Sequence, residues 1–333
     1  EVHLGYDRRL SRIIAIKLLR SDIAGDPTFQ ARFRREAQSA AALNHPSIVS
    51  VYDSGEEQVT TPNGAVRSVP YIVMEYVEGH TVREFLGEGE AVPIPEAVEI
   101  VTGVLDALEY SHRAGIIHRD IKPANILFTS YQRPVLSDFG ISAMSGPEGA
   151  EELRGMSVPW APPEQLRGEE ALTLAADVYG LAATVYTMLT GHAPHTDRAP
   201  DGRNDLLSML QRAQAGRIPP ITRPDAPEQL RRVLRTAMAP RPENRFATVL
   251  AFARELQQVQ RSLGQAPTEL DVMAEQPDVG ARGADAAPDA TVLRPVTAID
   301  PYSPAADSAA ADATRFKPRV IPPLPEGRDR TEE

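Results

Sequence analysis

Residues 116–128 read IIHRDIKPANILF, and this stretch decides how the rest of the chain is interpreted. Two apolar runs enclose a short segment that holds a carboxylate, Asp120, a cation, Lys122, and an amide, Asn125. A solvated turn between two short strands would account for the pattern. A loop that carries chemistry would account for it as well. The stretch alone leaves both interpretations open, so the flanking sequence has to decide between them.

A second carboxylate follows this loop in the motif Asp-Phe-Gly. Asp138 opens the motif, and Gly140 closes it with a residue that tolerates backbone angles other residues avoid. With the oxygen of Asn125, the carboxylate of Asp138 forms a hard donor set that suits Mg²⁺, an ion that also keeps water and phosphate oxygens as ligands. A three-residue motif is also typical of an ordinary turn, so the metal site depends on what the rest of the chain provides.

Two charged residues near the start of the chain fall on apolar faces. In AIKLL, residues 15–19, a period of two places Lys17 on the same strand face as Ala15. Glu36 lies on the apolar stripe of a predicted helix, together with Phe33. Lys17 alone would also fit an edge strand whose amine reaches solvent. A carboxylate on an apolar stripe is costly without a cation beside it, so we predict that Lys17 pairs with Glu36.

The periodicity of the sequence divides the chain into a small strand-rich region and a larger helical region. The predicted strands are residues 1–7, 12–19, 48–57, 69–79, 125–128 and 134–140. The predicted helices are residues 27–43, 95–114, 173–190, 204–215, 227–238 and 247–262. Pro62, Asn63 and Gly64 indicate a hairpin-type turn between two of the strands.

Composition excludes several classes of protein. The chain has 333 residues and a net charge of −11, which argues against nonspecific nucleic-acid binding because that needs clustered positive charge. It has no Cys, which excludes a disulfide framework, a Cys-ligated zinc site and a thiol nucleophile, and which suits a reducing compartment. No apolar run reaches the roughly 18 residues of a membrane span, and no signal peptide is visible.

Glu1 stands within a predicted strand, so we expect the natural protein to start further upstream.

The composition shifts after Gly264. Residues 264–333 are dominated by Ala, Asp and Pro, with few aromatic residues and no sustained period. Such a segment cannot bury enough apolar surface to offset the entropy lost on ordering, so we predict that it is disordered.

The order of the motifs along the chain is more specific than any one of them. A strand Lys is followed by a helix Glu, then by His-Arg-Asp-x-Lys-Pro-x-Asn, Asp-Phe-Gly, PPE and DVYGL. In this order the sequence resembles the eukaryotic-type protein kinases, and most of all the bacterial, actinobacterial-like Ser/Thr kinases. Three stretches are similar to the corresponding sequences of that family: FRREAQSAAALNHPSIVSVYDSGEE, PYIVMEYVEG and GIIHRDIKPANIL. The resemblance covers residues 1–263.

The resemblance implies an α+β, protein-kinase-like bilobal fold. A small antiparallel β lobe with one helix would span residues 1–77, a larger α-helical lobe residues 78–263, and a disordered tail residues 264–333. The first strand of the family fold and its Gly-rich loop over the phosphates are absent from the sequence. Glu1 and Val2 would be the remainder of that loop.

The resemblance also implies ATP as substrate, Mg²⁺ as cofactor and a catalytic role for several of these residues. Asp120 would accept or orient the proton of the substrate hydroxyl, and Lys122 would offset charge near the γ-phosphate. Lys at this place is the pattern of Ser/Thr kinases rather than of Tyr kinases. Lys17 would grip the α- and β-phosphates and would itself be fixed by Glu36. The implied Mg²⁺ ligands are Asn125 and Asp138.

The same resemblance implies an adenine site. Met74 would be the gatekeeper, and Glu75 to Val77 would form the hinge whose backbone groups bond the base. YIVMEYVEG agrees with this, since it is an apolar strand that leads to a Gly-containing exit. The residues implied around the ring are Ala15 and Leu127 on its two faces and Val2 as its cover.

Other residues match structural positions of the family. Glu164 of PPEQ would pair with Arg245, and Asp177 would anchor the backbone of the catalytic loop. His118 is expected to pack in that loop rather than to act as an acid or base. The two histidines of GHAPH, residues 191–195, have a metal-like spacing, but the family has a packing loop at this point.

The activation segment departs from the family pattern. Residues 138–164 contain no Thr, whereas related bacterial kinases commonly phosphorylate Thr there. Ser157 matches the position usually held by a Thr near the substrate. Arg119 resembles the Arg that often meets an activating phosphate, and we predict that a carboxylate partly replaces this phosphate, because carboxylates pair bidentately with guanidinium groups. The candidate carboxylates are Glu148, Glu151 and Glu152; the alternatives are phosphorylation of Ser142 or Ser145 and a merely solvated acidic loop.

The implied function is a Ser/Thr protein kinase that transfers the ATP γ-phosphate to protein hydroxyls and also phosphorylates itself, in bacterial signalling. Two alternatives stay open: a nucleotide-binding pseudokinase or scaffold, and a tail that recruits phosphopeptide-binding partners. The expected partners are protein substrates, phosphothreonine-binding domains on the tail and a second copy in a dimer, with no nucleic acid. The expected location is the cytoplasm, with membrane anchoring beyond Glu333 left open. The candidate tail phosphorylation sites are Thr268, Thr291, Thr297 and Thr314.

Overall fold

The computed structural model describes residues 1–19, 24, 26–60, 66–87, 91–139, 158–168, 173–199 and 202–269. The chain divides into two compact units, Glu1–Gln276 and Pro277–Glu333, and every described residue belongs to the first. Within these stretches no helix is both long enough and apolar enough to cross a membrane. The described chain is α+β, with its four longer strands before most of the helices, as the sequence predicts.

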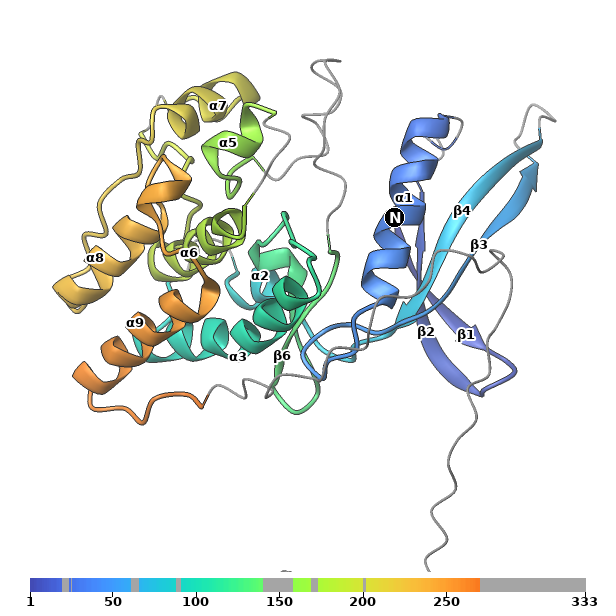
Figure 1. Cartoon of the computed structure of the whole chain (residues 1–333), viewed down its shortest axis with the longest axis horizontal. Helices are drawn as coiled ribbons and strands as arrows, with labels where there is room; N and C mark the ends of the chain where they lie inside the picture. Colours follow the sequence, from blue (N-terminus) through green and yellow to red (C-terminus); the bar gives the residue numbers. More distant parts are fainter. Residues whose placement is uncertain are drawn as a thin grey trace, which may run out of the picture. The chain divides into compact units, whose positions relative to one another are not determined.

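A four-stranded antiparallel sheet forms the first part of the described chain (Figure 1). Its strands are β1 (Val2–Asp7), β2 (Arg12–Leu18), β3 (Val51–Thr60) and β4 (Val66–Glu75), in the spatial order β1-β2-β4-β3. In the register of β2 against β4, Ala15 lies opposite Met74 and Lys17 lies opposite Ile72. Because directly opposite residues of antiparallel strands share a face, these four side chains lie on one side of the sheet.

Helix α1 (Pro27–Ala41) packs against this side of the sheet. The side chain of Asp26 caps the helix by accepting a hydrogen bond from the Thr28 N–H at 2.7 Å, and a proline fits the first turn. The helix buries its apolar stripe in a small hydrophobic cluster, called here the sheet cluster. The buried residues of the sheet cluster are Leu19, Ala24, Phe33, Ala37 and Ile72.

The rest of the described chain is largely helical. Its helices of nine or more residues are α3 (Ile94–Arg113), α6 (Ala175–Thr190), α7 (Leu206–Gln214), α8 (Glu228–Ala237) and α9 (Val249–Ser262). Nearly every residue of α6 is buried. Because a helix that is apolar all round has to be surrounded by protein, α6 lies at the centre, and α3, α8 and α9 pack against it (Figure 1). Two short strands, β5 (Ile126–Phe128) and β6 (Pro134–Leu136), form a second antiparallel sheet beside α3.

A second and much larger hydrophobic cluster, called here the main core, fills the helical part from α3 and α6 to β5 and β6. It includes Leu43 and Ile48, which follow α1, and it does not merge with the sheet cluster among the described residues. Backbone hydrogen bonds join the segment after α1 to the helical part. The Val49 N–H donates to the carbonyl oxygen of Leu136, and the Leu136 N–H donates to the carbonyl oxygen of Ser47, both across 2.9 Å. The segment that follows α1 is thereby anchored to the helical part.

The predicted elements are confirmed in kind, with shifts at their ends. The sequence predicts a strand at 48–57, whereas β3 begins at Val51 and continues to Thr60, because its last residues pair with the start of β4. Ile48 instead forms an isolated bridge with Leu136. The hairpin turn expected at 62–64 lies outside the described residues.

Two short helices, α2 (Val82–Phe85) and α5 (Pro163–Leu166), are absent from the sequence-based prediction. α2 starts with a capping box: the Thr81 hydroxyl accepts from the Glu84 N–H at 3.1 Å, and the Glu84 carboxylate accepts from the Thr81 N–H at 2.7 Å. Each helix is about one turn long, so neither is long enough for a periodic apolar pattern to reveal it.

Candidate active site

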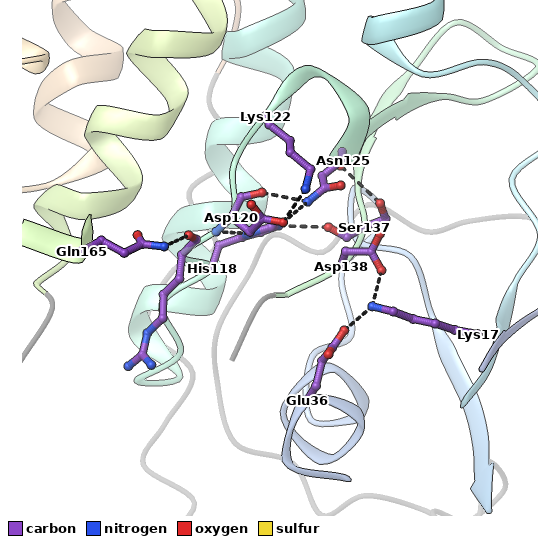
Figure 2. A network of polar contacts seen from close by, with 10 residues as sticks. Lys17, Glu36, His118, Asp120, Lys122, Asn125, Ser137, Asp138 and Gln165 are labelled. Carbon is purple, nitrogen blue, oxygen red and sulfur yellow. Dashed lines mark hydrogen bonds and ion pairs between the residues drawn. The ribbon is translucent and has the colours of Figure 1, made fainter. Parts of the chain in front are cut away.

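Lys17 connects the sheet to the helical part. Its Nζ bonds Oε1 of Glu36 on α1 and lies 2.8 Å from Oδ1 of Asp138, which follows β6 (Figure 2). The side chains of Lys17, Glu36 and Asp138 are only 22 %, 12 % and 31 % exposed. The predicted pair of Lys17 with Glu36 is therefore present, and Asp138 joins it from a distant part of the sequence.

The charges in this cluster are set by their mutual attraction as well as by burial. Burial alone would lower the pKa of Lys17, but the carboxylates of Asp138 and Glu36 outweigh burial and raise that pKa. Burial alone would raise the pKa of Asp138, but Lys17 outweighs it and holds the pKa below its ordinary value. For Glu36, burial outweighs the attraction of Lys17 and raises the pKa. At neutral pH Lys17 is therefore a cation and Asp138 an anion.

The loop after α3 brings Asp120, Lys122 and Asn125 together (Figure 2). Lys122 Nζ lies 2.7 Å from Asp120 Oδ2, and Asn125 Nδ2 donates to the same oxygen at 3.0 Å and to the Asp120 carbonyl oxygen at 2.8 Å. The Ser137 N–H donates to the Asn125 carbonyl oxygen at 2.9 Å, which ties the loop to the segment that carries Asp138. The other carboxylate oxygen, Oδ1 of Asp120, has no hydrogen bond to any residue of the described ranges.

A buried carboxylate fixes the backbone of this loop. Asp177, in the first turn of α6, accepts hydrogen bonds from the N–H groups of His118 and Arg119, each at 2.8 Å, and lies 2.7 Å from Nε2 of His112. Burial alone would raise the pKa of Asp177, but His112, which hydrogen-bonds to it, and the Arg119 N–H hold the pKa below its ordinary value. The predicted anchoring of the loop by Asp177 is confirmed.

His118 packs inside the loop. Its side chain is fully buried, its ring centroid lies 4.5 Å from that of Phe139, and its Nε2 lies 3.0 Å from the carbonyl oxygen of Ser137. These contacts match the expectation that His118 has a packing role.

Two residues of the site hold a left-handed backbone conformation. The φ angle is +67° at Arg119 and +57° at Asp138. Such angles are costly for residues other than Gly and persist where the surroundings enforce them. At Arg119 the surroundings include Gln165 of α5, whose Nε2 donates to the Arg119 carbonyl oxygen at 2.9 Å.

Neither His112 nor Gln165 stands out in the sequence pattern. His112 stands at the polar end of the pattern of α3, and Gln165 directly follows the PPE motif. Their functional contacts come from α6 and from the catalytic loop, which are distant in sequence. No periodic or motif signal in a single sequence indicates those partners.

The residues predicted around an adenine ring come from the sheet and from β5. Ala15 is buried and is paired with Met74 across β2 and β4, while Val2 is paired with Lys17 across β1 and β2 and is 57 % exposed. Leu127 is the middle residue of β5. The register therefore places Val2, Ala15 and Met74 on the same sheet face as Lys17.

The predicted hinge leaves β4 at Glu75. The Glu75 N–H is already bound, because it donates to the carbonyl oxygen of Ser50 at 2.8 Å. Within the described stretches, the backbone N–H and carbonyl groups of Val77 have no hydrogen-bond partner. The hinge therefore offers a backbone donor and a backbone acceptor to a ligand at Val77.

The predicted pair of Glu164 and Arg245 is confirmed. Arg245 Nη1 and Nη2 donate to the two carboxylate oxygens of Glu164 at 2.6 and 2.8 Å. Both side chains are at most 2 % exposed, and the Arg245 Nε also donates to the Ala239 carbonyl oxygen at 2.7 Å. The pair joins α5 to the segment before α9.

The two histidines of GHAPH have separate surroundings. His195 is fully buried and its Nε2 lies 2.9 Å from the hydroxyl of Tyr179, while the His192 ring packs edge-on against Tyr186. Among the described residues, no three His, Cys, Asp or Glu side chains are grouped as a metal site.

The predicted activation-segment residues lie outside the described ranges: Ser142, Ser145, Glu148, Glu151, Glu152 and Ser157.

Comparison with known proteins places these features in a family. The family model described as "Protein kinase domain" matches residues 1–259. The chain is 40 % identical over 280 residues to the serine/threonine-protein kinase PknB of Mycolicibacterium smegmatis, covering 83 % of this chain and 43 % of that protein. It is 42 % identical over 265 residues to PknB of Mycobacterium tuberculosis, covering 78 % of this chain and 40 % of that protein. The chain thus spans about two-fifths of the length of these relatives.

Proposed function

Because the chain belongs to the protein kinase domain family, we propose that it is a Ser/Thr protein kinase. In the proposed reaction, the hydroxyl oxygen of a protein Ser or Thr forms a bond to the γ-phosphorus of ATP. The bond from that phosphorus to the β–γ bridging oxygen breaks, ADP leaves, and the hydroxyl proton passes to a carboxylate. Phosphoryl transfer requires mainly positioning and charge neutralisation, which are what the clustered side chains supply.

Asp120 is the carboxylate assigned to the substrate hydroxyl. Lys122 and Asn125 both bind its Oδ2, so Oδ1 is the oxygen left to receive the proton. Lys122 is held at 2.7 Å from this carboxylate, where its ammonium group offsets negative charge on the transferring phosphoryl group.

Lys17 is assigned to the α- and β-phosphates. It stays charged because Glu36 and Asp138 raise its pKa, and the same contacts fix the direction of its side chain. The adenine ring is assigned to the space between Ala15 and Leu127, with Val2 as its cover and Met74 as the gatekeeper. Its hydrogen bonds are assigned to the hinge backbone, Glu75 to Val77, where the N–H and carbonyl groups of Val77 have no hydrogen-bond partner among the described residues.

The donor set of Asn125 and Asp138 fits Mg²⁺. The carboxylate of Asp138 is anionic, and the nitrogen of the Asn125 amide is turned toward Asp120, which leaves its carbonyl oxygen for a cation. When bound, the ion would neutralise charge on the phosphates of ATP.

We also propose the wider assignments implied by the family. Residues 1–77 and 78–263 are the two lobes, the substrates are proteins with exposed Ser or Thr, and the setting is bacterial cytoplasmic signalling. Dimerisation and recruitment of phosphothreonine-binding domains by residues 264–333 belong to the same proposal.

One observation supports an active kinase more than any other: Lys17, Glu36 and Asp138 form one charged cluster beside an Asp120 that keeps one carboxylate oxygen available. The test is Asp120→Asn in the purified protein with ATP and Mg²⁺. We expect nucleotide binding to persist and phosphate transfer to fall at least about a hundredfold, since general-base catalysis contributes roughly that much. Asp53→Asn, an exposed change on β3, is the control. Wild-type transfer by Asp120→Asn would reject the assignment.

A further inference from the structure

A hollow of about 490 Å³ lies on the helical part of the molecule. It is lined by the loop that follows α6, by the end of α7 and by the turn after α7. None of the residues assigned to phosphoryl transfer lines it. Its volume is that of a site for a ligand larger than a single small anion.

The lining of this hollow is positively charged. It contains three arginines, Arg198, Arg212 and Arg217, against one carboxylate, Asp197. His192 also lines the hollow, and burial keeps its pKa below the ordinary value, so its ring is neutral at pH 7. Three positive charges less one negative charge leave +2, in a chain whose net charge is −11. The hollow is therefore a local exception to the acidity of the chain.

The two sides of the hollow are held by the fold beneath them. Arg212 Nε donates to the carbonyl oxygen of His195 at 2.8 Å, which fixes α7 to the loop that follows α6. Tyr186 of α6 donates its hydroxyl to the carbonyl oxygen of Pro219 at 3.1 Å, and Ile218 packs against the main core. A ligand would therefore meet a preformed site, which lowers the entropy lost on binding.

Arg198 and Arg217 differ from Arg212. Both are exposed, and the side chain of neither has a hydrogen bond or an ion pair to another residue in the described ranges. Each guanidinium group can bind a carboxylate through two parallel hydrogen bonds. Two such groups on one hollow, beside a third arginine, fit a ligand that carries more than one carboxylate.

α7 links this hollow to the neighbourhood of Asp120. Leu206, Met209 and Leu210 of α7 pack with Val158 and Ala161, while Arg212 stands near the C-terminal end of the same helix. Residues 160–162 line a small gap together with Asp120. The N-terminal part of α7 thus packs on the segment that lies beside Asp120, and the C-terminal part of the same helix lines the hollow.

We propose that this hollow is a docking site for an acidic segment of the protein substrates, separate from the Ser or Thr that is phosphorylated. The inference rests on the proposed function, because it names the substrate class of that kinase. Carboxylates of the segment pair with Arg198 and Arg217, and the apolar floor at Ile218 receives its backbone or side chains.

Direct binding tests the site without relying on catalysis. A fluorescent peptide of alternating Asp and Gly is titrated with the whole chain and followed by anisotropy, beside a matched peptide of Asn and Gly. We expect only the acidic peptide to bind, with an affinity that falls as salt rises. Arg198→Glu with Arg217→Glu should weaken binding at least about tenfold. Arg232→Glu with Arg254→Glu, which reverses two exposed charges on α8 and α9, is the control and should bind as wild type does.

Kinetics then test docking as a property of the substrate. Two peptides share one Thr acceptor sequence, joined by a flexible linker to either the acidic or the Asn segment. With the wild-type protein, we expect the peptide with the acidic segment to have a KM about tenfold lower than the peptide with the Asn segment, at the same kcat. With the Arg198→Glu, Arg217→Glu variant, we expect the two peptides to have the same KM and an unchanged kcat. Equal KM values for both peptides, or equal binding by the two charge-reversed variants, would overturn the docking site. If neither peptide is phosphorylated, the proposed function fails, and the anisotropy result still decides whether the hollow binds acidic peptides.

Discussion

The side-chain amide of Gln165 donates to the backbone carbonyl oxygen of Arg119 across 2.9 Å. Gln165 is 7 % exposed, and Arg119 directly precedes Asp120 with a left-handed backbone. We expect Gln165→Leu, which removes the donor to this part-buried carbonyl, to lower kcat by up to about tenfold, because one hydrogen bond contributes roughly 0.5–1.5 kcal/mol and this one fixes the backbone directly before Asp120. The KM for ATP should not change, since the Lys17 cluster is untouched. Steady-state kinetics at saturating peptide measure both.

The matched control for this substitution is Gln258→Leu, because Gln258 is an exposed glutamine on α9. If Gln165→Leu leaves kcat unchanged, or raises the KM for ATP by as much as it lowers kcat, Gln165 does not position the loop.

A buried histidine makes stability depend on pH. Burial, and then the charge of Arg212, lower the pKa of His195 to about 4, from an ordinary value of 6.5. Between these values the unfolded chain binds a proton that the folded chain does not, so stability falls as the pH drops from 6.5 to 4. The full loss is on the order of 3 kcal/mol.

Urea denaturation of wild type and His195→Gln at several pH values measures this contribution. Between pH 7 and pH 4.5, we expect the free energy of unfolding to change less with pH in His195→Gln than in the wild type. His3→Gln, at an exposed position on β1, is the control. Parallel curves for wild type and His195→Gln would show that His195 titrates normally in the folded protein.

The buried pair of Glu164 and Arg245 should be highly sensitive to removal of one partner. Arg245→Met leaves an uncompensated carboxylate in the interior, and we expect a loss of about 3–5 kcal/mol of unfolding free energy. Adding Glu164→Met removes that carboxylate, so the double variant should be more stable than Arg245→Met alone. Chemical denaturation of the three proteins checks this, and additive losses would contradict the coupling.

The tail threonines should differ in how fast they are phosphorylated. Gln260 Nε2 donates to the Thr268 hydroxyl at 2.8 Å, and the Thr268 N–H donates to Gln260 Oε1 at 2.9 Å. We expect Thr268 to be modified more slowly than Thr291, Thr297 and Thr314, and Gln260→Leu to remove the delay. Mass spectrometry over time measures the order, with Asp120→Asn as the inactive control. If no tail phosphate depends on Asp120, the tail is not a substrate of this kinase.

Local periodicity is enough to predict the pair of Lys17 and Glu36, because each is a charged residue on an apolar face of its own strand or helix. Asp177 and the pair of Glu164 with Arg245 came from motifs that the chain shares with a family. The contact of Asp138 with Lys17 could not be predicted from periodicity, since it joins residues that lie on different parts of the fold. His112 and Gln165 cannot be predicted for the same reason, because their partners, Asp177 and the Arg119 carbonyl group, lie on segments that are distant in sequence.

The separation of the sheet cluster from the main core affects how cooperatively the molecule unfolds. The sheet cluster has few buried members, and of the described residues up to Glu75 only Leu43 and Ile48 belong to the main core. Few shared apolar contacts mean that the sheet can lose its hydrogen bonds while the helices keep theirs. Amides of β1 and β2 should therefore exchange with deuterium faster than those of α6. A nucleotide that touches both Ala15 and Leu127 would slow that exchange, so ligand binding and the cooperativity of unfolding would be linked in one molecule.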